Sequence, residues 1–579
     1  MKNSFVAFFD ILGFKNLVEK NSHEDLLEIY QESLYESLDL TDKYSNPIYT
    51  AISPEQEKDS SSIRIFVISD SIILVQEIFL NNKSDWIFNP INYEVAYPLS
   101  ESLGVSIYTA QLLLNRGIDN TEDANRFLTI PHQLEMVSWD KQTSKSIGKL
   151  FKQAIEAQDL ITVHGDYDVD GVTGAALLSQ FLKNKGANFN YYLPDRFGDG
   201  YGLNPNVVKK LAEQGTKILI TADCGISNND EISLAKSLGI KVIITDHHTL
   251  PEILPEADYI FHPGLSEDKS FHILSGVGTA FQLICDIDKM LDSVIENSLD
   301  DYVDLAVMGT IADISPLKGI NRQIVQFGIS KMKNSKRIGF LKLAEKAGIK
   351  LDLLTTRDIS HKISPRINAA GRMNKAVAAL ELLLAETEEE AENLAQKLED
   401  LNNQRRELSE KTFKEVEEII AKEIDLDKEK AIVIAGEDFH HGVIGIICSR
   451  VLEKYNRPAF IMAKEGEFSR GSARSNNINL VEALGSAEDI LVKFGGHHGA
   501  AGWSVRTDDI NILKKRILEY AEKALNSDDL APKVNVEVQI PVDKIDYYLY
   551  RELQDLAPFG LKNPEPIIGM KDCLIKDQY

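Results

Sequence analysis

The stretch from residue 146 to about 330 alternates short apolar runs with helix-like segments, and this alternation is the strongest constraint on the fold. The runs are I-T-V-H-G-D, A-N-F-N-Y-Y-L-P, K-I-L-I-T-A-D, K-V-I-I-T-D and Y-I-F-H-P. Strands that alternate with helices in this way form a parallel sheet. The sequence therefore predicts an α/β fold, with one domain over 146–375.

Aspartate and histidine side chains stand at the ends of four strand-like runs. They are His164, Asp168, Asp170, Asp223, His247, His248 and Asp313. In an open parallel sheet, ligands gather beyond the carboxyl ends of the strands. Alternate residues of an extended segment face the same way, so we expect Asp168 and Asp170 to converge and His164 to reach the same cavity. The run that ends at Asp313 is also compatible with a helix.

Three or more carboxylates in one crevice repel each other strongly unless cations lie between them. Two divalent ions about 3.5 to 4 Å apart, bridged by a carboxylate, activate water and stabilise the leaving oxygen of a phosphoester. Asp223 is the candidate bridge. Mixed aspartate and histidine ligands favour Mn²⁺ or Mg²⁺ over a structural zinc site, and the histidines favour Mn²⁺. Each residue alone is more often a helix cap, a turn aspartate or a core histidine than a metal ligand, and only the set together indicates metal.

The composition is that of a globular protein, and it disfavours one mode of nucleic-acid binding. Of the 579 residues, 43% are hydrophobic and 26% are charged, and the formal net charge is -26. This charge excludes adhesion to nucleic acid through a generally basic surface, but it leaves room for a local groove. The four cysteines are scattered, and we find neither a signal peptide nor an apolar run long enough to cross a bilayer. We expect a cytoplasmic protein without membrane contact.

The rest of the chain divides by composition. We expect a partial α+β segment over 1–79, a linker and helical lead-in over 80–145, and a second α/β lobe over 430–523. Residues 376–423 keep heptad-like apolar spacing without glycine or proline, which predicts one long helix within a connecting segment, 376–429. The last stretch, 535–579, predicts the first strands of a β-domain.

Several motifs carry a resemblance to a known family. G-D-Y-D-V-D-G, T-A-D-C-G, T-D-H-H and G-T-I-A-D resemble the four motifs of the DHH phosphoesterase superfamily. P-R-I-N-A-A-G-R and G-G-H-H-G-A-A-G are similar to its RecJ-like branch and to the DHH-associated domain. The resemblance covers roughly residues 90 to 579 and implies two lobes, one with a parallel sheet, joined by a long helix.

The resemblance also implies an activity. It implies a metal-dependent exonuclease, specific for single-stranded DNA, that works from the 5′ end in DNA repair and recombination with two Mn²⁺ or Mg²⁺ ions. Single-strand-binding protein and a helicase are candidate partners. The positions that match the family's metal ligands are His164, Asp168, Asp170, Asp223, His247 and Asp313. His248 matches a group that touches the scissile phosphate.

Further residues are candidates for substrate binding. By resemblance, Arg196, Ser472 and Arg474 hold the terminal 5′ phosphate, which suits the donors of arginine and serine. In G-G-H-H-G, the backbone of Gly495 and Gly496 can approach a phosphate, and His497 adds a donor, although a tight turn has the same composition. The last three candidates, which could line the strand path, are Arg366, Asn368 and Arg372.

Both chain ends depart from the family pattern. Residues 1–79 weakly resemble the opening of a nucleotidyl cyclase domain, in which Asp10 and Asp70 would hold Mg²⁺, but the chain changes character before such a domain is complete. We interpret this segment as a non-catalytic remnant or an artificial join. Residues 535–579 resemble an OB-fold that lacks the length for five strands.

Two other functions remain open from the sequence. The first is a phosphodiesterase of the same superfamily acting on short oligonucleotides or cyclic dinucleotides. The second is a non-catalytic replication scaffold, which should lack several of the motif aspartates, whereas this chain keeps them all.

Overall fold

The computed structural model describes residues 4–9, 64–68, 72–76, 85–134, 136–195, 200, 202–291, 299–373 and 375–571. The chain forms two compact units. One contains Pro131–Leu530 and Gly560–Lys562, and the other contains Met1–Ile130, Ala531–Phe559 and Asn563–Tyr579. Asp10 and Asp70 lie outside the described residues.

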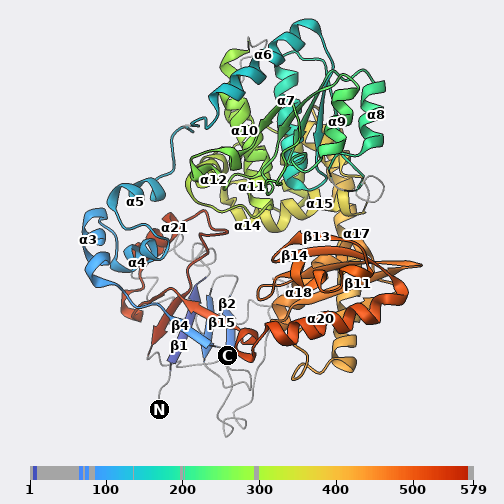
Figure 1. Cartoon of the computed structure of the whole chain (residues 1–579). Helices are drawn as coiled ribbons and strands as arrows, with labels where there is room; N and C mark the ends of the chain where they lie inside the picture. Colours follow the sequence, from blue (N-terminus) through green and yellow to red (C-terminus); the bar gives the residue numbers. More distant parts are fainter. Residues whose placement is uncertain are drawn as a thin grey trace. The chain divides into compact units, whose positions relative to one another are not determined.

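A five-stranded parallel sheet forms the centre of the first lobe, in the order β6-β5-β7-β8-β9 (Figure 1). The strands are β5 (Ile161–Gly165), β6 (Phe189–Tyr192), β7 (Ile218–Ala222), β8 (Lys241–Thr245) and β9 (Tyr259–Phe261). They coincide with the five predicted runs. The predicted α/β fold with a parallel sheet is confirmed.

Helices cover both faces of this sheet, because alternate residues of each strand point to opposite sides. On β7, Ile218 and Ile220 enter the large core, while Leu219 packs in a second core with α8 (Pro205–Glu213) and α9 (Asn229–Ser237). The large core contains α6 (Lys141–Ala157), α7 (Val169–Asn184), α10 (Gly276–Ile287), α11 (Val303–Ala312), α12 (Gly319–Met332) and α13 (Ile338–Lys346).

The run before Asp313, for which the sequence left strand and helix open, is the helix α11 (Val303–Ala312). Nine of its ten residues are fully or nearly fully buried, since it packs between α7, α10 and α12. A helix buried on all sides has no amphipathic stripe, so its sequence reads like that of a buried strand. Asp313, the last of the candidate metal ligands in the sequence, therefore follows a helix and not a strand.

The connecting segment contains two helices, so the prediction of one long helix was wrong at its start. A short buried helix, α16 (Val377–Leu384), ends before Thr387, whose side chain caps α17 (Glu388–Glu423) by accepting a hydrogen bond from the Glu390 amide. The 36 residues of α17 extend about 54 Å at 1.5 Å per residue. A new helix begins here because Thr387 caps its N-terminus and the three glutamates of its first turn interact favourably with the helix dipole. The same residues are also compatible with a continuous helix, so the sequence did not reveal the break.

The second lobe has a mixed sheet in the order β10-β11-β12-β14-β13. Its strands are β10 (Ile432–Gly436), β11 (Ala459–Glu465), β12 (Phe468–Arg474), β13 (Leu491–His497) and β14 (Ala500–Arg506). The helices are α18 (His441–Tyr455), α19 (Leu480–Gly485) and α20 (Ile510–Ala524). Short helical elements, including α14 (Thr356–Asp358) and α15 (Ser364–Met373), precede the connecting segment.

The other unit joins segments from both halves of the sequence. Its helices are α3 (Tyr93–Leu103), α4 (Ile107–Asn115), α5 (Thr121–Leu128) and α21 (Tyr547–Asp555), which share one core with β16 (Val538–Gln539). Arg116 is buried in this core and pairs with Glu537 at 2.7 Å. The lead-in helices and the start of the OB-like stretch are therefore packed together, which their separation in sequence did not predict.

Strands from the start of the chain extend the sheet of this unit, in the order β16-β17-β1-β3-β2. They are β1 (Ser4–Phe9), β2 (Arg64–Ile68), β3 (Ile72–Gln76) and β17 (Ile568–Lys571). β2 and β3 form an antiparallel pair, and β1 lies antiparallel to β17. A separate parallel pair joins β4 (Asp85–Phe88) to β15 (Lys533–Val536). Among the described residues, no helix has the length and apolar character to cross a membrane.

Candidate metal centre

Three groups of ligand atoms meet beyond the carboxyl ends of β5, β7 and β8. Within each group the atoms lie within 4.8 Å of one another. The groups are Asp166 with Asp168 and Asp223, Asp170 with His247 and Asp313, and Asp223 with His247 and His248. Asp223 and His247 each belong to two groups, so the three sets form one connected cluster. The cluster brings together six of the seven predicted residues and adds Asp166.

The start of α7 shapes the first part of the cluster. Asp168 is the N-cap of this helix and accepts a hydrogen bond from the Gly171 amide at 3.1 Å. Asp170 lies in the first turn, and its two oxygens accept hydrogen bonds from the Gly276 and Val277 amides at 2.7 and 2.9 Å. Asp168 and Asp170 belong to two different ligand groups of the cluster, and a helix start carries them, not the predicted extended segment.

Asp223 follows β7 in a left-handed conformation, with φ of 63°. Aspartate is among the few non-glycine residues that adopt this region readily. Its Oδ1 lies 3.1 Å from Nε2 of His247. A Cβ atom on Gly276, at the start of α10, would lie 2.4 Å from the Cβ of Asp223. The first residue of α10 must therefore be glycine for the helix to approach this carboxylate.

Asp246 organises the two histidines that follow β8. One of its oxygens accepts hydrogen bonds from the His247 amide at 2.7 Å and from Nδ1 of His248 at 2.8 Å, and the other accepts from the Ile226 amide at 2.9 Å. Burial raises the pKa of Asp246, but the hydrogen bond and charge of His248 outweigh it and lower the pKa to about 2. The same contact overcomes the effect of burial on His248 and raises its pKa to about 9.

Burial and mutual repulsion dominate the electrostatics of the other carboxylates. Burial raises the pKa of Asp170 well above its ordinary value, and the charges of Asp313 and Asp168 add to the shift. The pKa of Asp223 rises for the same reasons. Burial also raises the pKa of Asp313, although Ser315 donates a hydrogen bond to it at 2.6 Å. Such a cluster favours a bound cation, because positive charge removes the cost of ionising each group.

His164 lies outside these three groups among the described residues. Its ring is fully buried at the end of β5, 3.6 Å from the sulfur of Cys224 and stacked on Tyr192. Its assignment as a metal ligand stays a prediction.

The candidates on α15 face two different neighbours. Arg366 forms a bidentate ion pair with Glu399 on α17. Arg372 donates a hydrogen bond to the Gly442 carbonyl, at the start of α18, at 3.1 Å. Asn368 is half-buried on the same helix. A Cβ on Gly371 would lie 2.8 Å from the Tyr167 carbonyl, so α15 packs directly against the loop that carries Asp168. A substrate role for these three residues stays a prediction.

The remaining substrate candidates lie in the second lobe or outside the described part. Ser472 and Arg474 stand on one face of β12, close to Gly445 of α18, whose added Cβ would lie 3.2 Å from Oγ of Ser472 and 3.4 Å from Nη2 of Arg474. Gly495, Gly496 and His497 end β13 and pair with β14 in an exposed hairpin. Arg196 is outside the described residues. These assignments also stay predictions.

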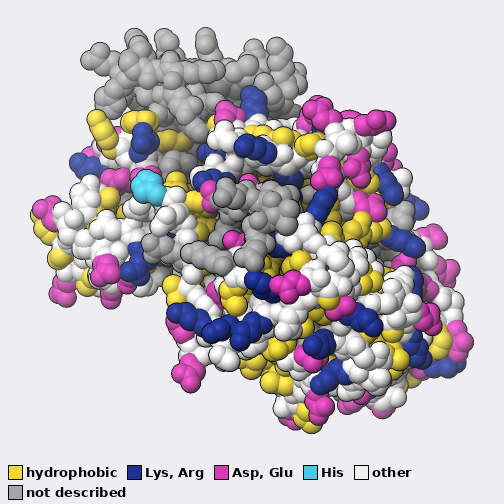
Figure 2. All heavy atoms as spheres, turned by 90° about the horizontal axis from the view of Figure 1, so that it is seen from above, with side chains coloured by type: hydrophobic (Ala, Val, Ile, Leu, Met, Phe, Trp, Pro, Cys, Tyr) yellow, Lys and Arg dark blue, Asp and Glu magenta, His cyan; other side chains and the backbone are white. Residues whose placement is uncertain are grey.

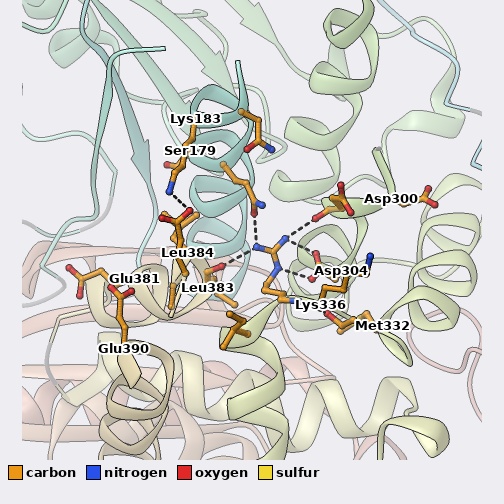
Figure 3. A pocket seen from close by; sticks show the side chains of 18 of the residues that line it. Ser179, Lys183, Asp300, Asp304, Met332, Lys336, Glu381, Leu383, Leu384 and Glu390 are labelled. Carbon is orange, nitrogen blue, oxygen red and sulfur yellow. Dashed lines mark hydrogen bonds and ion pairs between the residues drawn. The ribbon is translucent and has the colours of Figure 1, made fainter. Parts of the chain in front are cut away.

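A cavity of about 590 Å³ opens away from this cluster (Figure 3). It is lined by the C-terminal part of α7, including Ser179 and Lys183, whereas Asp168 and Asp170 lie at the N-terminal end of that helix. Arg337 fills one wall, where it contacts Asp304 at 2.7 Å, Gln180 at 2.6 Å and the Leu383 carbonyl at 3.0 Å. Arg337, at the start of α13, therefore joins α7, α11 and α16 at a place separate from the metal-binding cluster.

Sequence reasoning missed three contributors to the cluster. Asp166 was part of the quoted G-D-Y-D-V-D-G, and Asp246 was part of T-D-H-H, but neither was given a role. The third contributor, S-G-V-G at 275–278, supplies the amides that hold Asp170. A serine N-cap followed by glycine at the start of an apolar segment was the available signal.

Three family models match the chain in order. Residues 160–310 match the DHH family, N-terminal domain, residues 428–523 match the DHHA1 domain, and residues 536–579 match the RecJ OB domain. The crystal structure of RecJ in complex with Mn²⁺ from Thermus thermophilus superimposes with a TM-score of 0.73 at 31% identity, covering 84% of this chain and 69% of that one.

Curated relatives agree with these matches. The single-stranded-DNA-specific exonuclease RecJ of Bacillus subtilis is 34% identical over 502 residues, which cover 86% of this chain and 63% of the relative. The protein of the same name from Thermus thermophilus is 36% identical, with 60% of its length covered, so the chain spans less than two thirds of these two relatives. The Haemophilus influenzae protein is 31% identical over 81% of this chain and 84% of its own length. The chain belongs to the RecJ family.

Proposed function

We propose that this protein is an exonuclease that removes nucleotides from the 5′ end of single-stranded DNA with the help of two divalent cations. The observation that carries the proposal is the cluster in which Asp223 and His247 are each shared between two ligand groups. A shared carboxylate such as Asp223 suits a pair of ions better than one ion, because it can bridge both at a short separation, whereas His247 offers one nitrogen to one ion.

The donor set fits Mn²⁺ or Mg²⁺. It consists of carboxylate and imidazole groups, while the nearby thiol of Cys224 is buried and its pKa is raised well above the ordinary value by burial and by the carboxylates. Asp166, Asp168, Asp170, Asp223, His247 and Asp313 would hold the ions. When bound, two such ions supply a water of lowered pKa and stabilise charge on the phosphoryl oxygens. RecJ of Thermus thermophilus has been crystallised with Mn²⁺ and with Mg²⁺.

His248 is suited to bind the scissile phosphate. Its Nδ1 donates to Asp246, and this bond fixes the ring and keeps the imidazole protonated at neutral pH. A cationic imidazole donates a charge-assisted hydrogen bond to a phosphoryl oxygen. Asp246 acts through His248, because both of its carboxylate oxygens accept hydrogen bonds from groups of the protein.

Residues of α15 and β12 support a path for the strand. Arg372 reaches from α15 to the start of α18, and Gly445 of that helix packs against Ser472 and Arg474. We assign the 5′ phosphate to the group formed by Arg196, Ser472 and Arg474, and the adjoining strand to Asn368, Arg372 and the hairpin at Gly495, Gly496 and His497. Arg366 would contact DNA only in competition with Glu399.

The surface charge is mixed on the face shown in Figure 2, where basic and acidic side chains of the described residues are interspersed. We include in the proposal a role in DNA repair and recombination within the cytoplasm, with single-strand-binding protein and a helicase as partners.

The test is a nuclease assay with three substrates: a long 5′-phosphorylated single strand, the same sequence as a blunt duplex, and a dinucleotide. We expect Mn²⁺-dependent release of mononucleotides from the 5′ end of the single strand. Faster turnover of the dinucleotide would favour the small-substrate phosphodiesterase instead. No hydrolysis of any substrate under a metal series, with the protein folded, would favour the scaffold.

A further inference from the structure

His262 lies directly behind the candidate metal centre. It follows β9, the strand that neighbours β8 at the edge of the parallel sheet, and it is 2% exposed. Neither its residue type nor its position in F-H-P marked it as functional. Although His262 lies outside the T-D-H-H motif, it contacts His248 of that motif directly.

Both ring nitrogens of His262 have partners. Nδ1 accepts a hydrogen bond from the Gly264 amide at 2.9 Å. This contact leaves the ring proton on Nε2, which lies 2.9 Å from the backbone carbonyl of His248. An amide can only donate and a carbonyl can only accept, so the two bonds together define the neutral Nε2–H tautomer.

The bond from His262 completes the support of His248. Asp246 holds the amide of His248 at 3.1 Å and its Nδ1 at 2.8 Å, while His262 holds its carbonyl. The loop after β8 is therefore anchored on both sides of His248. The bond from His262 restricts the peptide that follows His248, and this peptide sets the backbone position from which the imidazole extends.

We propose that His262 is a positioning residue for the reaction, which acts by fixing the peptide of His248 so that its imidazole points at the phosphate. This inference rests on the proposed function of His248. Hydrogen-bonding partners behind metal-ligating histidines typically affect metal affinity or activity by about 10- to 100-fold, and we expect an effect of this order at His248, which lies beside the metal centre. A different role for His262, as a cap for the turn at Pro263–Leu265, would affect folding without a specific effect on turnover.

Two substitutions separate these roles. The amide nitrogen of glutamine occupies nearly the place of Nε2, so His262→Gln keeps the donor to His248, whereas His262→Phe fills the space without it. We expect His262→Phe to lower kcat about 10- to 100-fold with KM changed less than about threefold, and His262→Gln to recover most of the loss. His272→Phe is the matched control, because His272 also bonds a nearby backbone carbonyl, that of Ser266, but is exposed and has no contact with His248.

Mn²⁺ affinity by calorimetry and the thermal midpoint serve as further readouts. The proposal is overturned if His262→Phe keeps full kcat, if glutamine and phenylalanine lose activity equally, or if the loss follows from weaker Mn²⁺ binding or unfolding alone.

A spectroscopic test does not depend on nuclease activity. Long-range ¹⁵N–¹H correlation spectra of the Mg²⁺ form, labelled in histidine, should show His262 as the Nε2–H tautomer. They should also show ring shifts of His248 that change in His262→Phe and are retained in His262→Gln and His272→Phe. Unchanged His248 shifts in His262→Phe would refute the coupling. If the His248 shifts change in His262→Phe but the protein hydrolyses no DNA, the proposed function is refuted. The contact between His262 and His248 is then still supported.

Discussion

At the scale of single residues, the arrangement of the metal-binding cluster lowers the stability of the metal-free protein. Asp223 adopts a left-handed backbone conformation, lies buried among other carboxylates, and accepts the close approach of Gly276. Each feature costs free energy in the metal-free protein. Because the pKa of Asp223 is raised on folding, the part of the cost that comes from ionising its carboxylate depends on pH. This part is absent at pH values below the ordinary pKa of an aspartate and grows as the pH rises towards neutral.

Asp223→Asn should therefore separate stability from activity. Asparagine tolerates the left-handed conformation but carries no charge. We expect the metal-free protein to gain about 1 kcal/mol at pH 7, with a smaller gain at pH 4, and nuclease activity to fall by about 10³-fold or more. Thermal unfolding in EDTA at both pH values checks the first part. Asp508→Asn, on an exposed turn, is the control, and equal destabilisation of both variants at pH 7 would contradict the expectation.

Gly276→Ala tests the close approach of α10. The added Cβ would lie 2.4 Å from the Cβ of Asp223, so the helix must move and draw its amides away from Asp170. We expect a loss of about 1 to 3 kcal/mol in unfolding free energy and weaker Mn²⁺ binding by calorimetry. Gly485→Ala is the matched control, because a Cβ there meets nothing within 4 Å. Unchanged Mn²⁺ affinity in Gly276→Ala would show that the approach is not required.

At the scale of elements, the centre depends on helices as much as on strands. α7 supplies Asp170, α10 supplies the amides that hold it, and Asp313 ends α11. The three helices pack against one another. At the cavity shown in Figure 3, Arg337 links α7 and α11 again through Gln180 and Asp304. This junction is structural, because the guanidinium donates every bond to the protein itself.

Arg337→Gln should destabilise the lobe without changing the chemistry. Asp304 would be left 7% exposed without its cation, and breaking such a buried pair costs about 3 to 5 kcal/mol. Lys331→Gln, which breaks the exposed pair with Asp300, should cost at most about 1 kcal/mol. Denaturant unfolding compares the two. We expect kcat per folded molecule to stay near that of the parent protein, and a large drop in kcat at low temperature would instead assign the cavity to the site.

At the scale of the whole molecule, the chain builds one unit from distant segments. Arg116, the C-cap of α4, is buried and binds Glu537 at 2.7 Å, Asn563 at 2.6 Å and the Pro564 carbonyl at 2.7 Å. Residues more than 400 positions apart therefore share one core. The unit that contains the metal centre has its own, separate hydrophobic cores.

Arg116→Gln should selectively destabilise the unit that contains α4 and α21. We expect a loss of about 3 to 5 kcal/mol there, because Glu537 would be left as an unpaired buried charge. Calorimetry should resolve two transitions, with only one shifted to lower temperature. Arg126→Gln, which breaks exposed pairs on α5, is the control and should cost less than about 1 kcal/mol. A common shift of both transitions would show that the units unfold together.

The sequence by itself determined the parallel sheet and most of the cluster. Alternating apolar and amphipathic runs require βα units, and parallel strands bring their carboxyl ends to one edge, so Asp223, His247 and His248 had to meet there. Periodicity failed where burial is complete, as in α11, and where a cap competes with helix continuation, as at Thr387.

Only the tertiary structure decided which groups support those ligands. The amides of α10 on Asp170, the bond from His262 to His248, and the pairing of Arg366 with Glu399 all join segments that are distant in sequence. A local pattern reports the backbone conformation and the buried face of an element. It does not report which distant donor fills a particular acceptor, because that is settled by packing once the elements have assembled.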